Sequence, residues 1–188
     1  MTAPIIPLRS APYQGPSDLL LLFRSIKLLV CDVDGILTDG TVSVGAEVET
    51  KRFSLRDGLG IKLLRWQGIL VAWISHRTSA ATKQRARELE IDFLHQGPEN
   101  KVEICEQCLD EFELEWDDIC YMGDDIVDLG PMRRARLAIT VPDALEEVRM
   151  IAHYRTHARG GQGAVREVAE MILRAQGLWH SLIEEYSV

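Results

Sequence analysis

Four short segments of the chain are apolar along their whole length, and stretches with helical spacing lie between and after them. The apolar segments are residues 26–31, 69–74, 119–122 and 137–141. The helical patterns cover residues 58–66, 79–90, 99–112, 125–134, 144–150 and 163–175. A strand that is apolar on both faces must be covered on both faces, as in a parallel sheet between two layers of helices. The pattern therefore predicts an α/β fold, a doubly wound (Rossmann-like) parallel sheet.

One segment departs from this alternation. Residues 41–44 and 47–50 alternate between polar and apolar side chains, and Gly45 and Ala46 between them can form a turn. We therefore expect residues 40–53 to form a β-hairpin that projects from the sheet just after its first strand.

The length of 188 residues is that of one domain. Residues 1–17 contain four prolines and are predicted to be a flexible leader. The domain itself is assigned to residues 18–176, and residues 177–188 are assigned to a C-terminal tail. The glycine-rich segment 159–163 is expected to begin the last helix of the domain and to contact another subunit.

Composition excludes several classes of partner. The formal net charge is −8, from 29 acidic and 21 basic residues, which disfavours binding to nucleic acid. No apolar run approaches the roughly 18–20 residues that a bilayer crossing requires, so no membrane partner is expected.

Cys105 and Cys108 fall at helical spacing with apolar residues and are expected to face the core. With no second cysteine pair to complete a zinc site, the chain is predicted to be a reduced, cytoplasmic protein.

The first apolar strand ends in Asp32-Val33-Asp34-Gly35. Residues i and i+2 of an extended chain point the same way, so Asp32 and Asp34 are expected to share one site. Two adjacent carboxylates repel each other unless a cation lies between them or one is protonated. A hard cation with oxygen ligands, Mg²⁺, fits this pair best.

Three further polar signals fall at strand ends or helix starts. Ser75 ends the second apolar strand, Lys101 stands near a helix start, and Gly123-Asp124-Asp125 follows the third strand, with Asp128 one turn further. Each signal alone is common in turns and helix caps. In a doubly wound sheet, however, the carboxyl ends of the strands are where ligands bind. Together with the Asp32 and Asp34 pair, these three signals predict a phosphate-binding site with a third carboxylate for the metal.

These four signals resemble the motifs of the haloacid dehalogenase phosphatase superfamily. The resemblance implies that Asp32 is the nucleophile, forming an aspartyl phosphate, and that Asp34 is the general acid and then the base. It implies that Ser75 and Lys101 hold the phosphoryl oxygens. The implied metal site uses Asp32, the backbone carbonyl of Asp34, and Asp124, with Mg²⁺ as the cofactor.

Motif spacing narrows the subgroup. The interval from Asp32 to Ser75 holds a hairpin and one helix, and that from Ser75 to Lys101 holds one helix and a short strand. Neither can hold a separate cap domain, so an oligomer that uses the hairpin is expected to enclose the substrate.

A closer resemblance runs from about residue 26 to residue 176. It rests on residues 32–40, 56–61, 96–101 and 160–167, and it is to the 3-deoxy-D-manno-octulosonate 8-phosphate phosphatase family. This family implies a homotetramer that hydrolyses a sugar-acid phosphate in lipopolysaccharide biosynthesis. The implied substrate contacts are Asp34, Ser54, Leu55, Arg56, Asp57, Gly58, Lys62, Arg77, Arg85 and Lys101.

The second motif departs from the family pattern. The family usually has Thr-Gly-Arg, whereas this chain has Ser75-His76-Arg77. His76 adds bulk and a titratable ring near the expected phosphate site. A nonulosonate 9-phosphate phosphatase, or the phosphatase-like oligomerisation module of sialate cytidylyltransferases, therefore stays open as an alternative. A phosphorylated receiver domain is a second class of alternative, although its motif order differs.

Overall fold

A computed structural model describes residues 16–45 and 49–187. Its main sheet has the strand order β5-β4-β1-β6-β7-β8, and every neighbouring pair is parallel. The strands are β1 (Leu28–Cys31), β4 (Leu70–Ser75), β5 (Phe93–Gln96), β6 (Ile119–Met122), β7 (Leu137–Thr140) and β8 (Tyr154–Arg155). The predicted α/β class with a parallel sheet is confirmed.

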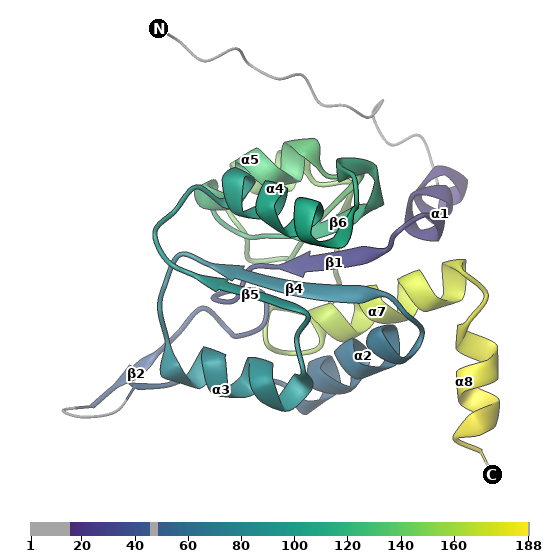
Figure 1. Cartoon of the computed structure of the whole chain (residues 1–188), viewed down its shortest axis with the longest axis horizontal. Coiled ribbons are helices and arrows are strands. Elements are labelled where there is room, and N and C mark those ends of the chain that lie inside the picture. Colours follow the sequence, from purple (N-terminus) through teal and green to yellow (C-terminus); the bar gives the residue numbers. More distant parts are fainter. Residues whose placement is uncertain (1–15, 46–48, 188) are drawn as a thin grey trace, which may run out of the picture.

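Helices cover both faces of this sheet (Figure 1). On one face lie α4 (Lys101–Phe112) and α5 (Leu129–Arg134), and on the other lie α2 (Leu55–Trp66), α3 (Ala80–Leu89) and α7 (Ala164–Ala175). Helix α6 (Glu146–Ile151) packs beside α5 and β7. Side chains of Ser54, Ser79 and Asn100 accept hydrogen bonds from the first turns of α2, α3 and α4, which fixes where these helices start.

All four residues of β1 are buried, as are those of β6 and β7, because each strand has sheet neighbours on both sides and helices on both faces. The predicted inward orientation of Cys105 and Cys108 is confirmed, since both are fully buried on α4. Among the described residues, no helix combines the length and apolar character needed to cross a membrane.

The sheet edges and the chain ends differ from the sequence prediction. Strand β8 was missed because two residues leave no periodicity to detect. Helix α1 (Pro16–Arg24) begins inside the predicted leader, whose residues 1–15 lie outside the described ones. Within the predicted tail, α8 (Trp179–Glu185) packs on α7 through the buried Leu182.

The predicted hairpin is present. Strands β2 (Ser43–Val44) and β3 (Glu49–Thr50) pair antiparallel, with Ser43 opposite Thr50. Residues 46–48 between the strands, which include Ala46 of the predicted turn, lie outside the described residues. In Figure 1 the hairpin projects from the end of the molecule toward which β1 points. Within residues 16–45 and 49–187 no separate cap domain stands over the sheet, as predicted.

Candidate active site

The site lies where β1 and β6 end side by side. Cys31 and Met122 are register partners at the ends of these strands, so the next residues of both strands leave the sheet together. The backbone N–H of Asp32 donates to the carbonyl of Met122 at 2.9 Å. Carboxylate oxygens of Asp32, Asp124 and Asp128 lie within 4.8 Å of one another. We call these three residues and the lysine among them, Lys101, the acidic cluster.

Lys101 neutralises part of the charge in this cluster. It is the first residue of α4 and is 2% exposed. Its Nζ donates to Oδ1 of Asp32 at 2.5 Å and to Oδ1 of Asp128 at 2.7 Å. These two carboxylates raise the pKa of Lys101 against the effect of burial, which by itself lowers it, so the ammonium form is held between them.

Asp128 is fully buried and has both oxygens occupied. Oδ1 accepts from Lys101 and from the hydroxyl of Tyr121, at 2.7 and 2.8 Å. Oδ2 accepts from the backbone N–H groups of Asp124 and Asp125, at 3.1 and 3.2 Å. Although Asp128 lies within ligand distance of the other two carboxylates, its acceptor capacity is filled. It therefore holds Lys101 and the Asp124 loop in place and is a poor metal ligand.

Asp32 and Asp124 have the character of metal ligands. Burial, with repulsion from Asp128, raises the pKa of Asp32 to about 7 although Lys101 opposes the change. Burial, with repulsion from Asp32 and Asp128, raises the pKa of Asp124 to about 8. Oδ1 of Asp124 is buried without a hydrogen-bond partner. A divalent cation between Asp32 and Asp124 would satisfy that oxygen and remove the repulsion, so these residues fit Mg²⁺.

Two glycines let the backbone approach this cluster. Gly35 has a φ of +102°, and a Cβ there would overlap the carboxylate of Asp124. Gly160 packs against the backbone of Gly35 so closely that a Cβ would overlap its carbonyl oxygen. The N–H of Gly161 donates to the carbonyl of Ile36 at 2.9 Å. The glycine-rich segment before α7, a helix entry as expected, thus also supports the loop after Asp32 from within the same chain.

Asp34 lies beside the cluster and has a different partner. Nζ of Lys51 lies 2.7 Å from Oδ1 and 2.8 Å from Oδ2 of Asp34. We expected Asp32 and Asp34 to point the same way because both would lie on an extended strand. That premise is wrong, since β1 ends at Cys31. Asp32 directly follows β1, a turn begins at Asp34, and each of the two carboxylates pairs with its own lysine.

Ser75 and Arg77 lie at the neighbouring strand end. Ser75 is buried, and its hydroxyl exchanges hydrogen bonds with the backbone of Arg77, at 3.1 and 3.2 Å. The guanidinium of Arg77 forms an ion pair with Glu49 of β3. Both predicted residues therefore lie at the carboxyl end of β4, and both are held there by local contacts.

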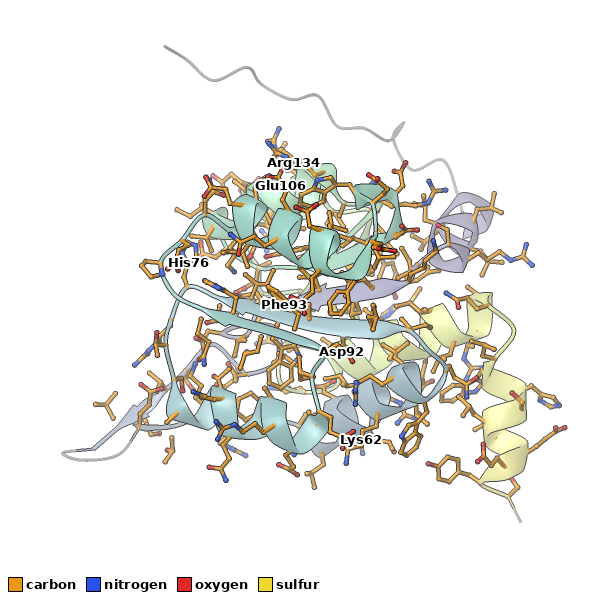
Figure 2. All side chains as sticks on the ribbon, viewed as in Figure 1. Lys62, His76, Asp92, Phe93, Glu106 and Arg134 are labelled. Carbon is orange, nitrogen blue, oxygen red and sulfur yellow. The ribbon has the colours of Figure 1, made fainter. Side chains whose placement is uncertain are left out.

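His76 is exposed at the same strand end (Figure 2). It lines a groove of about 700 Å³ together with Lys101, Val127 and Arg134. His76, which replaces the glycine of the family pattern, thus stands at the rim of the site, outside the acidic cluster.

The remaining predicted substrate contacts lie on α2 and α3. Ser54 caps α2, and the buried Asp57 accepts from the N–H groups of Gly163 and Arg166, at 3.2 and 2.7 Å. Gly58 packs against the guanidinium of Arg85. Leu55, Arg56 and Lys62 also lie on α2. Figure 2 shows Lys62 on the helical layer opposite the one that carries Glu106 and Arg134.

No hydrogen bond or ion pair within the described part of the chain joins Lys62 or Arg85 to the acidic cluster. Sequence reasoning also missed three residues that contact the candidate site residues, namely Lys51, Tyr121 and Glu49. Lys51 gave no signal because it lies in the predicted hairpin just after the alternating residues 47–50, where a charged residue is expected at the surface.

Comparisons with known proteins agree with this geometry. The chain is 38% identical to the curated 3-deoxy-D-manno-octulosonate 8-phosphate phosphatase KdsC of Yersinia pestis over 165 residues, covering 86% of this chain and 88% of that relative. The solved 3-deoxy-D-manno-octulosonate 8-phosphate phosphatase from Moraxella catarrhalis, in complex with magnesium, phosphate and a KDO molecule, has a TM-score of 0.89 at 38% identity. The match covers 92% of this chain and 99% of the Moraxella catarrhalis chain.

A probable YrbI family phosphatase from Pseudomonas syringae pv. phaseolica has a TM-score of 0.89 at 41% identity, covering 92% of this chain and 98% of its own. No family model matches the chain. The relatives named here are phosphatases, which favours that class over the receiver-domain alternative.

Proposed function

The chain belongs to the 3-deoxy-D-manno-octulosonate 8-phosphate phosphatase family of the haloacid dehalogenase superfamily, and from that membership we propose its reaction. The substrate is 3-deoxy-D-manno-octulosonate 8-phosphate, and the products are 3-deoxy-D-manno-octulosonate and inorganic phosphate. The acidic cluster is the single observation that carries the proposal, because three carboxylates gather around a buried lysine where β1 and β6 end. This arrangement suits phosphoryl transfer, which depends mainly on positioning and charge neutralisation.

In the first half of the reaction, an oxygen of Asp32 attacks phosphorus and the bond from phosphorus to the sugar oxygen breaks. Asp34 donates its proton to the departing oxygen, so the sugar leaves as an alcohol. The product on the protein is an aspartyl phosphate. Lys101 contacts Asp32 directly, so it would hold the nucleophile in place and be within reach of the phosphoryl group that Asp32 attacks.

In the second half, water attacks the phosphorus of the acyl phosphate. Asp34, now ionised, accepts the proton of that water, and the bond from Asp32 to phosphorus breaks. Inorganic phosphate leaves, and both aspartates return to their initial states. Ser75 stands at the neighbouring strand end, where its hydroxyl can donate to a phosphoryl oxygen after exchanging its contact with Arg77.

Mg²⁺ would be held by Asp32, the backbone carbonyl of Asp34, and Asp124. When bound, it neutralises charge on the phosphoryl group and on the aspartates around it. The orphaned Oδ1 of Asp124 supports this assignment.

Cationic side chains on α2, α3 and the loop after β4 are proposed to recognise the sugar acid. We define Lys62, Arg77 and Arg85 as the cationic face. A substrate with a phosphate and a carboxylate needs such groups. Arg77 stands at the strand end next to the cluster of its own chain, whereas a homotetramer would bring Lys62 and Arg85 of one subunit to the site of another. A cytoplasmic location and a role in lipopolysaccharide biosynthesis remain predictions from the family.

The test is phosphate release by the full chain from the eight-carbon substrate and from a nonulosonate 9-phosphate, each with Mg²⁺ and with chelator. We expect kcat/KM to favour the eight-carbon substrate by about tenfold or more, since specificity here depends on placing charged groups. Chelator should abolish both activities. Preference for the nine-carbon substrate, or full activity with chelator, would overturn the proposal. Acid quenching during turnover should add the mass of one phosphoryl group to the peptide that contains Asp32.

A further inference from the structure

A lysine from the hairpin lies in the site without an assigned role. Lys51 directly follows β3, and its side chain is 0% exposed, whereas that of Asp34 is 30% exposed. Its Nζ contacts both oxygens of Asp34, at 2.7 and 2.8 Å. A fully buried ammonium that meets both oxygens of one carboxylate fixes the plane of that carboxylate as well as its place.

Contacts on both sides fix Lys51 itself. Glu49, two residues earlier, forms an ion pair with Arg77, and Phe53, two residues later, stacks on Trp73 with ring centroids 6.1 Å apart and planes 6° apart. These contacts attach Glu49, Lys51 and Phe53 to the body of the protein. Lys51 therefore reaches Asp34 from a segment attached at two further points.

We propose that Lys51 is a positioning residue for the proton transfers of Asp34. It holds the carboxylate so that one oxygen can face the departing alcohol oxygen and then the attacking water. The hairpin thus contributes to the chemistry of its own chain, apart from any role in enclosing substrate. This inference rests on the proposed function, specifically on Asp34 as the general acid and base.

The test compares two phosphate esters that differ in their need for a proton. The natural substrate releases an alkyl oxygen, which must be protonated, whereas p-nitrophenyl phosphate releases a stable phenolate. The variants are Lys51→Met, Asp34→Asn, the double variant, and Arg52→Met. Arg52 is the adjacent exposed cation and serves as the matched control. The quantity measured is kcat/KM, which reports the steps through release of the alcohol.

Lys51→Met should lower kcat/KM for the alkyl ester by about 10- to 100-fold and for the aryl ester by less than about threefold. Asp34→Asn should show the same pattern with a larger loss. In the Asp34→Asn background, Lys51→Met should have little further effect, because the lysine acts through the aspartate. Arg52→Met should leave both esters unchanged.

Each contrary outcome has a distinct meaning. If Asp34→Asn lowers both esters equally, the proposed role of Asp34 fails. If Asp34→Asn discriminates between the esters and Lys51→Met does not, the positioning role of Lys51 fails. A further loss from Lys51→Met in the double variant, as large as in the wild-type background, also overturns that role.

Circular dichroism and thermal melting verify that each variant is folded. If Lys51→Met does not fold, Lys51→Arg takes its place, since it keeps the charge but changes the geometry of the donor. Selective loss on the alkyl ester then supports the inference. An equal loss on both esters, or no loss, contradicts it.

Discussion

The acidic cluster and the cationic face differ in how the chain holds them. Every member of the cluster follows a buried strand or begins a helix, and Lys101 and Asp128 are almost entirely shielded from solvent. The cationic face lies on helix surfaces and a loop, where Arg77 pairs with Glu49 and Arg85 with Glu88. The groups proposed to perform chemistry are thus assembled inside one chain, whereas two of the three groups proposed to recognise substrate, Arg77 and Arg85, are paired with local carboxylates.

This contrast has a physical basis. Charges that act on phosphorus must keep their geometry through the reaction, and burial with full hydrogen bonding provides that. Charges that bind substrate must exchange their partners when substrate arrives, which is easier for a partly exposed ion pair. Each variant below tests whether one of the two regions behaves in this way.

The largest expected effect is on turnover. Asp32→Asn removes the proposed nucleophile and should reduce kcat by at least about a thousandfold. Lys101 keeps Asp128 as its partner, so the melting temperature should be close to that of the unmodified chain. Phosphate-release assays and thermal melts check both expectations. Residual turnover within tenfold of the original would refute the assignment of Asp32.

The second effect is on stability. Asp128→Ala leaves Lys101, the hydroxyl of Tyr121 and two backbone N–H groups without their acceptor. Removing one partner of such a buried charge network should lower the free energy of unfolding by about 3–5 kcal/mol. Denaturant unfolding measures the change. Tyr121→Phe is the matched milder variant, which removes one hydrogen bond and should cost about 1 kcal/mol.

A third effect is on the pH dependence of stability. The pKa values of Asp32 and Asp124 are raised to about 7 and about 8 in the folded chain, whereas unfolded aspartate titrates near about 3.9. Between these limits the folded, cation-free chain therefore binds more protons than the unfolded chain. Its free energy of unfolding falls as pH rises, by up to about 1.4 kcal/mol per pH unit for each of the two carboxyl groups.

Mg²⁺ needs the ionised oxygens, so its addition should raise the melting temperature more at about pH 8 than at about pH 5. Asp124→Asn is the control, which should weaken both the pH slope and the response to Mg²⁺. A stability that rises with pH in the cation-free chain would contradict the prediction.

The smallest effects are expected on the cationic face. Lys62→Met and Arg77→Ala should change the free energy of unfolding by less than about 1 kcal/mol, because these groups are partly exposed. Each should raise KM for the eight-carbon substrate by about tenfold, with a smaller change in kcat. A large loss of stability would show that this face supports the fold. An unchanged KM would remove the residue from the substrate site.

The sequence predicted the acidic cluster better than its surroundings. Asp32, Lys101 and Asp124 could be found because strand ends and helix starts are local signals, and a parallel sheet brings its strand ends together. Lys51 could not be found, because its burial depends on how the hairpin folds back onto the sheet. That hydrogen bonds occupy both carboxylate oxygens of Asp128 could not be predicted either. One of these bonds comes from the hydroxyl of Tyr121, and the sequence shows Tyr121 only as a member of an apolar strand. The contacts of Asp57 with α7 depend on side-chain geometry between residues more than a hundred positions apart.

The support that Gly160 gives to the loop after Asp32 has a consequence for synthesis on the ribosome. The loop after Asp32 is made early, but the backbone that supports it lies some 120 residues later in the chain. Domains form as their segments leave the exit tunnel, at roughly 5–20 residues per second. A nascent chain that stalls before Gly160 would therefore carry every acidic residue of the site yet lack the backbone that supports the loop after Asp32, and we expect it to be inactive until translation resumes.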